Sequence, residues 1–246
     1  MCIRDSRPSE LLGAVARRAR AELGRLVYDG ITVGVAWGTT MAALAGNLPP
    51  LSASQSTVVQ LNGAGSVADL GISYAEDILA MFATAWHAST LVFPVPAFFD
   101  HASTRDALWR ERSIQRVRDV QRSCDLAVFS VGSTTAQVPS RVYQAGYVSA
   151  QDHEVLDSEG AVGDIATNFF RSDGSFDGIA LNRRARGLPL DELWETPARL
   201  CIAAGTGQAS AVAGALNGGF ITHLVADLAL LEAVDELTRN PEGSDP

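Results

Sequence analysis

The chain of 246 residues, 47% of them hydrophobic and 19% charged, has the composition of a folded protein large enough to bury one α/β core. Its net charge of -9 argues against direct binding to nucleic acid or to a membrane surface, because both need clustered basic residues. The three widely spaced cysteines argue against a zinc site and a disulfide framework, and without a membrane-length apolar run or a signal peptide the chain is expected in the cytoplasm.

The first part of the chain predicts a helix, a strand and a second helix. Residues 1–10 match nothing downstream, and we interpret them as a remnant and a linker outside the fold. The apolar spacing predicts a helix over residues 8–29, and Gly30 is a natural stop at its C-terminus. The apolar run ITVGVAW at residues 31–37 predicts a strand, which a short turn joins to a helix over 41–46.

The rest of the chain alternates apolar strands with helices. This alternation predicts one α/β domain over residues 11–238, built on a doubly wound and mostly parallel sheet, with a frayed tail over 239–246. We predict strands over residues 57–66, 88–99, 125–133, 200–204 and 221–227, helices over 73–88, 103–123, 142–145, 152–156, 208–217 and 228–238, and a turn over 171–178.

Four of the predicted strands end in small, glycine-containing loops, which we call the rim loops. Ligands of open parallel sheets bind beyond the carboxyl ends of the strands, so we expect these loops to lie together. Glycines let the backbone approach a ligand, and free N–H groups at helix starts attract anions such as a phosphate or a sugar phosphate. The same residue types also cap helices and form turns, so each loop has a structural explanation too. The rim loops are Gly38-Thr39-Thr40, Asn62-Gly63-Ala64-Gly65-Ser66, Gly132-Ser133-Thr134-Thr135 and Gly205-Thr206-Gly207-Gln208.

Three polar residues outside the rim loops are further candidates. Asp164 is suited to accept hydrogen bonds from sugar hydroxyls, or else it is a turn residue. Asn182 and Arg183 are suited to clamp an anion, or else Arg183 is a solvated charge. Scattered histidines without ligand spacing, together with the absence of P-loop and G-x-S-x-G motifs, predict no metal site, no cofactor and no catalytic set.

Six short motifs follow one another along most of the chain: VGVAWGTT at 33–40, VQLNG at 59–63, FPVPAF at 93–98, GAVGDI at 160–165, LNR at 181–183 and LVAD at 224–227. Their order resembles the effector-binding domain of the SorC/DeoR-type bacterial transcriptional regulators, from about residue 11 to 237. The resemblance implies the fold of glucosamine-6-phosphate deaminase, ribose-5-phosphate isomerase and CoA transferases, with a small inserted subdomain. It also implies a sugar, polyol or phosphorylated sugar as effector and a homo-oligomer, either a dimer or a tetramer.

The resemblance also implies roles for individual residues. Gly38, Thr39 and Thr40 would hold the effector phosphate, Asp164 would face sugar hydroxyls, and Arg183 would lie near the pocket. The other residues implied at the effector site are Asn62, Gly63, Ala64, Gly132, Ser133, Gly205, Thr206, Gly207 and Gln208.

The chain departs from the family pattern in three places. Gln208, or a close neighbour, stands where the family's Gly-Gly-x-x-Lys motif has its lysine. Ala64 replaces a second glycine, and Leu228 follows Asp227 where the family has an acidic residue. Losing the lysine removes a charge-assisted contact to a phosphate. The departures therefore leave a phosphorylated sugar, a neutral sugar, a polyol and another small metabolite all open as effectors.

The family's proteins begin with a helix-turn-helix domain, and no such segment is expected here before residue 11. Operator DNA would then be bound only through a domain absent from this chain. The leading hypothesis is the effector-sensing and oligomerising part of a regulator. The alternative is a sugar-phosphate isomerase or deaminase of the same fold, which the lack of a carboxylate–histidine set disfavours. A third reading is a domain that keeps the fold without its ligand.

Overall fold

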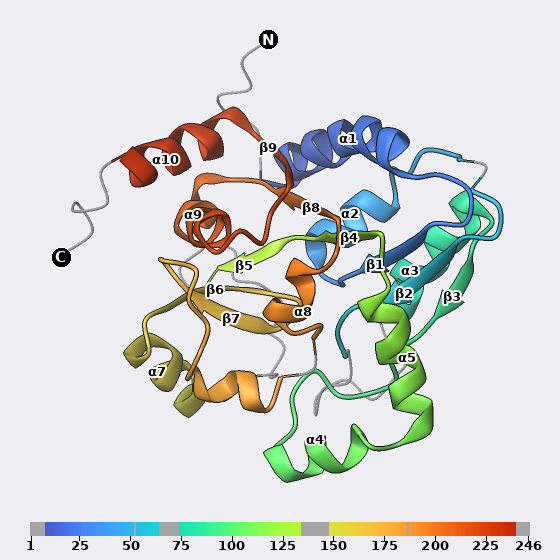
Figure 1. The fold of residues 1–246 in the computed structure, drawn as a ribbon. Helices are drawn as coiled ribbons and strands as arrows, with labels where there is room; N and C mark the ends of the chain where they lie inside the picture. Colours follow the sequence, from blue (N-terminus) through green and yellow to red (C-terminus); the bar gives the residue numbers. More distant parts are fainter. Residues whose placement is uncertain (1–7, 52, 64–73, 134–147, 186, 240–246) are drawn as a thin grey trace.

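The computed structural model describes residues 8–51, 53–63, 74–133, 148–185 and 187–239. Among them, six parallel strands form a central sheet in the order β3-β2-β1-β4-β8-β9 (Figure 1). The chain therefore starts in the middle of the sheet and builds outward in both directions, which confirms the doubly wound prediction. The strands are β1 (Thr32–Val35), β2 (Thr57–Gln60), β3 (Ser89–Leu91), β4 (Leu126–Phe129), β8 (Ala198–Ala203) and β9 (His223–Ala226).

Helices cover both faces of this sheet because its strands are apolar on both sides. In β4, Leu126 and Val128 join one core cluster, whereas Ala127 and Phe129 join the other. The first core is completed by α1 (Pro8–Leu26), α2 (Thr39–Ala45) and α3 (Tyr74–Trp86). The second is completed by α5 (Arg112–Arg122), α8 (Leu190–Trp194), α9 (Ala209–Asn217) and α10 (Leu228–Arg239).

A second, smaller sheet is antiparallel and contains β5 (Val131–Ser133), β6 (Ala161–Ile165) and β7 (Asn168–Arg171). It follows β4 directly, since a single residue, Ser130, separates β4 from β5. The sheet packs closely on α9: a Cβ at Gly163 would lie 2.6 Å from the Ala211 Cβ and 2.5 Å from the Gly132 carbonyl oxygen. Only glycine permits this approach, which fixes the small sheet beside the large one.

Several predicted elements are confirmed with small shifts of their ends. The predicted helices over 73–88 and 228–238 are α3 and α10, and the predicted strands over 200–204 and 221–227 are β8 and β9. The helical patch over 152–156 is α7 (Ala150–Ser158), which begins with a capping box. The predicted helix over 208–217 is α9, preceded by the 3-10 turn η2 (Thr206–Gln208). The patch over 142–145 lies outside the described residues.

Other predicted elements are wrong in length or number. The helix over 103–123 is divided into α4 (Ala102–Leu108) and α5, because Glu111 is extended and Trp109 packs against Phe93. The strand over 88–99 is only the edge strand β3, since Pro94 and Pro96 lack N–H groups and the Phe93 N–H donates to the Gln60 side chain instead.

Two further boundaries differ. The helix predicted over 8–29 ends at Leu26, after which the chain turns back so that the Ile31 N–H donates to the Tyr28 carbonyl. The strand predicted over 125–133 is two strands of different sheets, so Gly132 and Ser133 lie within β5 and not in a loop. The hairpin of β6 and β7 was not predicted, because its turn residues are Ala166 and Thr167.

Candidate functional site

The turn after β1 lies at the point where the strand order reverses, between β2 on one side and β4 on the other. Gly38 has a φ of 149° and precedes α2, whose first residues are Thr39 and Thr40. Neither threonine hydroxyl hydrogen-bonds to another described residue, and α2 has no side-chain cap. Thr39 is exposed and Thr40 is half-buried, so both hydroxyls can reach a ligand at this switch point.

Trp37 ties the first rim loop to the second. Its indole Nε1 donates to the Gly63 carbonyl at 2.8 Å, and its backbone N–H donates to Asn62 Oδ1 at 3.4 Å. Asn62 is 2% exposed, and a Cβ at Gly63 would lie 2.3 Å from the Pro96 carbonyl oxygen. Asn62 and Gly63 therefore fix the position of the first rim loop through Trp37. Ala64, Gly65 and Ser66 lie outside the described residues.

Gln208 connects the loop after β8 to β5. Its Oε1 accepts from the Ala204 N–H at 2.9 Å, and its Nε2 donates to the Val131 carbonyl at 2.7 Å. The buried Ser133 hydroxyl reinforces the same junction by donating to the Gly207 carbonyl at 3.0 Å. The amide of Gln208 thus serves the backbone, whereas Thr206 and Gly207 are exposed at the surface of the loop.

Asp227 closes the same loop from the end of β9. One carboxylate oxygen accepts from the Gly205 N–H at 2.7 Å, and the other accepts from the Leu230 N–H at 3.1 Å. The carboxylate therefore caps the start of α10 and holds the loop after β8 with the same side chain.

Asp164 reaches the rim because β6 pairs with β5, which places it opposite Gly132. The aspartate is 4% exposed, and its Oδ2 accepts from the Thr167 N–H at 3.1 Å. This bond closes the two-residue turn at Ala166 and Thr167, which have positive φ values of 48° and 70°. Such a backbone is strained for residues other than glycine, so the carboxylate supports a turn that would otherwise be unfavourable.

Asn182 and Arg183 lie in the 3-10 turn η1 (Ala180–Arg183), outside the rim loops. The Asn182 amide is committed to the backbone of Phe169, accepting at 2.7 Å and donating at 2.8 Å, so its predicted role as an anion clamp is wrong. Arg183 ends η1 and is exposed. It lines a hollow of about 370 Å³, and Arg105 donates to its carbonyl at 3.2 Å. No rim-loop residue that the structure describes lines this hollow, but Gly187, which does, forms a β-bridge with Asn62 of the second rim loop, so the hollow borders the rim.

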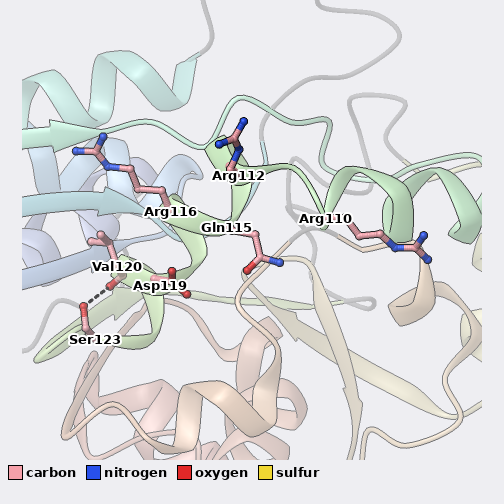
Figure 2. Close-up of a pocket in the computed structure, with 7 residues that line it drawn as sticks. All are labelled: Arg110, Arg112, Gln115, Arg116, Asp119, Val120 and Ser123. Carbon is pink, nitrogen blue, oxygen red and sulfur yellow. Dashed lines mark hydrogen bonds between the residues drawn. The ribbon is translucent and has the colours of Figure 1, made fainter.

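A second hollow, of about 560 Å³, follows α5, and three of its seven lining residues are arginines (Figure 2). Figure 2 shows the guanidinium groups of Arg110, Arg112 and Arg116 pointing in different directions, so they do not converge on one anion. On the neighbouring side of the helix, Arg118 and Arg122 meet Glu192 of α8 at 2.8 Å and 3.1 Å. The inner arginines of α5 therefore hold the helix to the body of the molecule, and the outer ones are solvated.

The two described cysteines are buried and unreactive. Burial raises the pKa of the Cys124 and Cys201 thiols to about 12, so both remain protonated and unreactive at neutral pH. Within the described ranges, there is no group of three or more histidine, cysteine, aspartate or glutamate side chains that could hold a metal ion. Nor does any helix among those residues have the length and apolar character to cross a membrane.

Comparison with known proteins gives this arrangement a family. A family model described as "Putative sugar-binding domain" matches residues 4–234, which is nearly the whole chain. The chain belongs to this sugar-binding domain family. A relative among curated proteins, the deoxyribonucleoside regulator of Bacillus subtilis, is 31% identical over 201 residues, which cover 82% of this chain and 63% of the relative. This sugar-binding domain thus spans less than two thirds of that regulator's length.

Solved structures show the same fold. A domain of "a possible sugar-binding transcriptional regulator" from Arthrobacter aurescens is 41% identical, with a TM-score of 0.89 over 95% of this chain and 89% of that one. The full-length sorbitol operon regulator SorC from Klebsiella pneumoniae gives a TM-score of 0.84 over 92% of this chain and 73% of its own, at 22% identity. At that identity the likeness concerns the fold alone.

Proposed function

We propose that this sugar-binding domain senses a small effector, a sugar, a polyol or a sugar phosphate, for a SorC/DeoR-type transcriptional regulator. The observation that carries the proposal is the rim at the switch point between β1 and β4, where the threonine hydroxyls, the β5–β6 pair with Asp164 and the loop after β8 meet the same edge. The names of three relatives support it: a deoxyribonucleoside regulator, a sorbitol operon regulator and an erythritol catabolism regulatory protein.

The rim residues divide into two roles under this proposal. Those with exposed or half-buried groups at the edge would contact the effector: Gly38, Thr39, Thr40, Gly132, Thr206 and Gly207, with Asp164 below them. Those whose side chains are committed to the protein would position the loops: Trp37, Asn62, Ser133 and Gln208. Arg183 would lie near the pocket, in the hollow that borders Asn62.

Effector binding would act by shifting the protein between two arrangements of a dimer or tetramer. A ligand moves such an equilibrium only by its difference in affinity for the two states. The rim loops suit this role, since they come from different strands and one ligand would bridge them. Operator DNA would be bound by a helix-turn-helix domain outside the present chain, and the regulator would work in the cytoplasm.

An isomerase or deaminase activity is disfavoured. Such reactions need a positioned general acid and base, and the four histidines of the chain, at positions 87, 101, 153 and 223, all lie outside the rim loops. The relatives are named as regulators of transcription, which favours binding without turnover.

Isothermal titration of the purified chain with sugars, polyols and their phosphates would test the proposal. A ligand found in this way should lose affinity by tenfold or more in Thr39→Val with Thr40→Val, because both free hydroxyls are removed. The matched control, Thr39→Ser with Thr40→Ser, keeps the hydroxyls and should retain binding. Equal affinity of the valine and serine variants would refute the site, and release of an isomerised or deaminated product would refute the non-enzymatic function.

A further inference from the structure

We infer that the rim takes an uncharged, polyhydroxylated effector in preference to a phosphate ester. The inference rests on the proposed function, because it concerns the ligand of the same site. It is carried by the contacts of the loop after β8 and by the charges of the described residues around the rim.

The backbone N–H groups after β8 are already occupied by side chains of the protein. Gln208 Oε1 accepts from the Ala204 N–H, and Asp227 Oδ2 accepts from the Gly205 N–H. A phosphate bound at a strand end needs such N–H groups, because they supply much of its binding. Here an internal carboxylate takes the position that a phosphate oxygen would take at Gly205.

Gln208 itself offers nothing to an anion. Its Nε2 donates to the Val131 carbonyl at 2.7 Å, so the donor end of the amide is used within the protein. The Ser133 hydroxyl is likewise used, since it donates to the Gly207 carbonyl at 3.0 Å. The junction of β5 and β8 is therefore closed by neutral hydrogen bonds.

The charges around the rim are unfavourable for a dianion. Asp164 and Asp227 place two carboxylates at this edge. Across the described part of the chain, no arginine belongs to a rim loop or hydrogen-bonds to one, and the full sequence contains no lysine. Two described arginines near these loops in sequence are used elsewhere: Arg199 donates to the carbonyls of Trp194, Thr196 and Gly219, and Arg122 donates to Asp119 and Glu192. At the loop after β8, a phosphate dianion would therefore meet the Asp227 carboxylate without a lysine to offset its charge.

A neutral polyol fits the same groups. The hydroxyls of Thr39 and Thr40 both donate and accept, and they hydrogen-bond to no described residue. A carboxylate accepts from a ligand hydroxyl, whereas a phosphate dianion has no proton to give it. The hydroxyl and carboxylate groups of the rim therefore match the hydroxyl groups of an alcohol better than the oxygen atoms of an anion.

Matched pairs of ligands test the inference on the unaltered chain. Erythritol, sorbitol and 2-deoxyribose would each be titrated beside their own terminal phosphate esters at a pH of about 7.5, where the esters are mostly dianions. We expect the neutral member of at least one pair to bind, and its ester to bind at least tenfold more weakly. An ester that binds more tightly than its neutral partner would overturn the inference and leave the proposed function standing. If no compound of either kind binds, the proposed function fails and the inference fails with it.

Variants at Gln208 supply an independent measurement. Gln208→Lys introduces a cation of similar length, and Gln208→Met removes the same two hydrogen bonds without adding charge. Relative to Gln208→Met, we expect Gln208→Lys to bind the phosphate esters at least tenfold more tightly and the neutral compounds equally well. Equal ester affinity in the two variants would show that the missing cation does not set the preference, and would overturn the inference.

Discussion

Replacing Trp37 by phenylalanine tests whether one indole hydrogen bond holds two rim loops together. The indole is 8% exposed, and it donates to the Gly63 carbonyl at 2.8 Å. Removing the donor leaves that carbonyl without its partner inside a buried loop, at a cost of about 1–3 kcal/mol. The smaller ring also leaves unfilled space, which adds roughly 1 kcal/mol. We therefore expect Trp37→Phe to lower the free energy of unfolding by about 2–4 kcal/mol.

Trp194 provides a matched control. Its Nε1 donates to the Gly218 carbonyl at the same distance of 2.8 Å, but its side chain belongs to a residue that is 43% exposed. Water can replace that donor, so Trp194→Phe should cost less than about 1 kcal/mol.

Urea denaturation of the two tryptophan variants, followed by far-ultraviolet circular dichroism, measures both costs without depending on tryptophan fluorescence. Titration with a ligand of the parent chain should also show weaker binding in Trp37→Phe alone, since Trp37, unlike Trp194, joins the first two rim loops. Equal losses of stability in the two variants would refute the argument, because burial would then not distinguish them.

Three further predictions concern the stability of the fold and the reactivity of its buried thiols. Gly163→Ala should destabilise the fold by about 1–3 kcal/mol in urea, since its new Cβ overlaps backbone and side-chain atoms, whereas Gly24→Ala in α1 has open space and should be stabilising. Cys124 and Cys201 should resist iodoacetamide at a pH of about 8 until the chain unfolds. Because their folded pKa values, about 12, exceed the ordinary 9.0, the stability that they contribute is complete below about pH 9 and declines above it. Glu192→Gln, which weakens two ion pairs to α5, should cost about 1–3 kcal/mol in the same denaturation assay.

The sequence predicts the parallel sheet well because its signals are local. The buried strands are short apolar runs, and most of them are followed by a helix, so the order of elements can be deduced without any knowledge of contacts. The β6–β7 hairpin escapes such reasoning, since Ala166 and Thr167 replace the glycine or asparagine that usually marks its turn. The break at Trp109 escapes it too, because packing against Phe93 decides it.

In the candidate site, too, local features could be predicted from the sequence, and features that depend on packing could not. The loops at Gly38, Asn62 and Gly205 follow strand ends as the sequence indicates, whereas Gly132 and Ser133 lie within β5. Trp37 and Asp227 were not predicted as supports of the rim loops, because their partners Gly63 and Gly205 are distant in the sequence. Asn182 and Arg183 are adjacent in the sequence, which suggested that they clamp an anion together. The Asn182 amide instead bonds to the Phe169 backbone, which depends on how η1 packs against β7, and Arg183 is exposed beside a hollow.

The strand order has a consequence for the synthesis of the protein. The loop at Gly38 leaves the ribosome before Asp227, which secures the opposite side of the rim through Gly205 and follows about 190 residues later. At roughly 5–20 residues per second, that interval is about 10–40 seconds. During this time the central strand β1 has been synthesised, while the edge strand β9 does not yet exist. A nascent chain therefore has only half of the rim until Asp227 has left the ribosome.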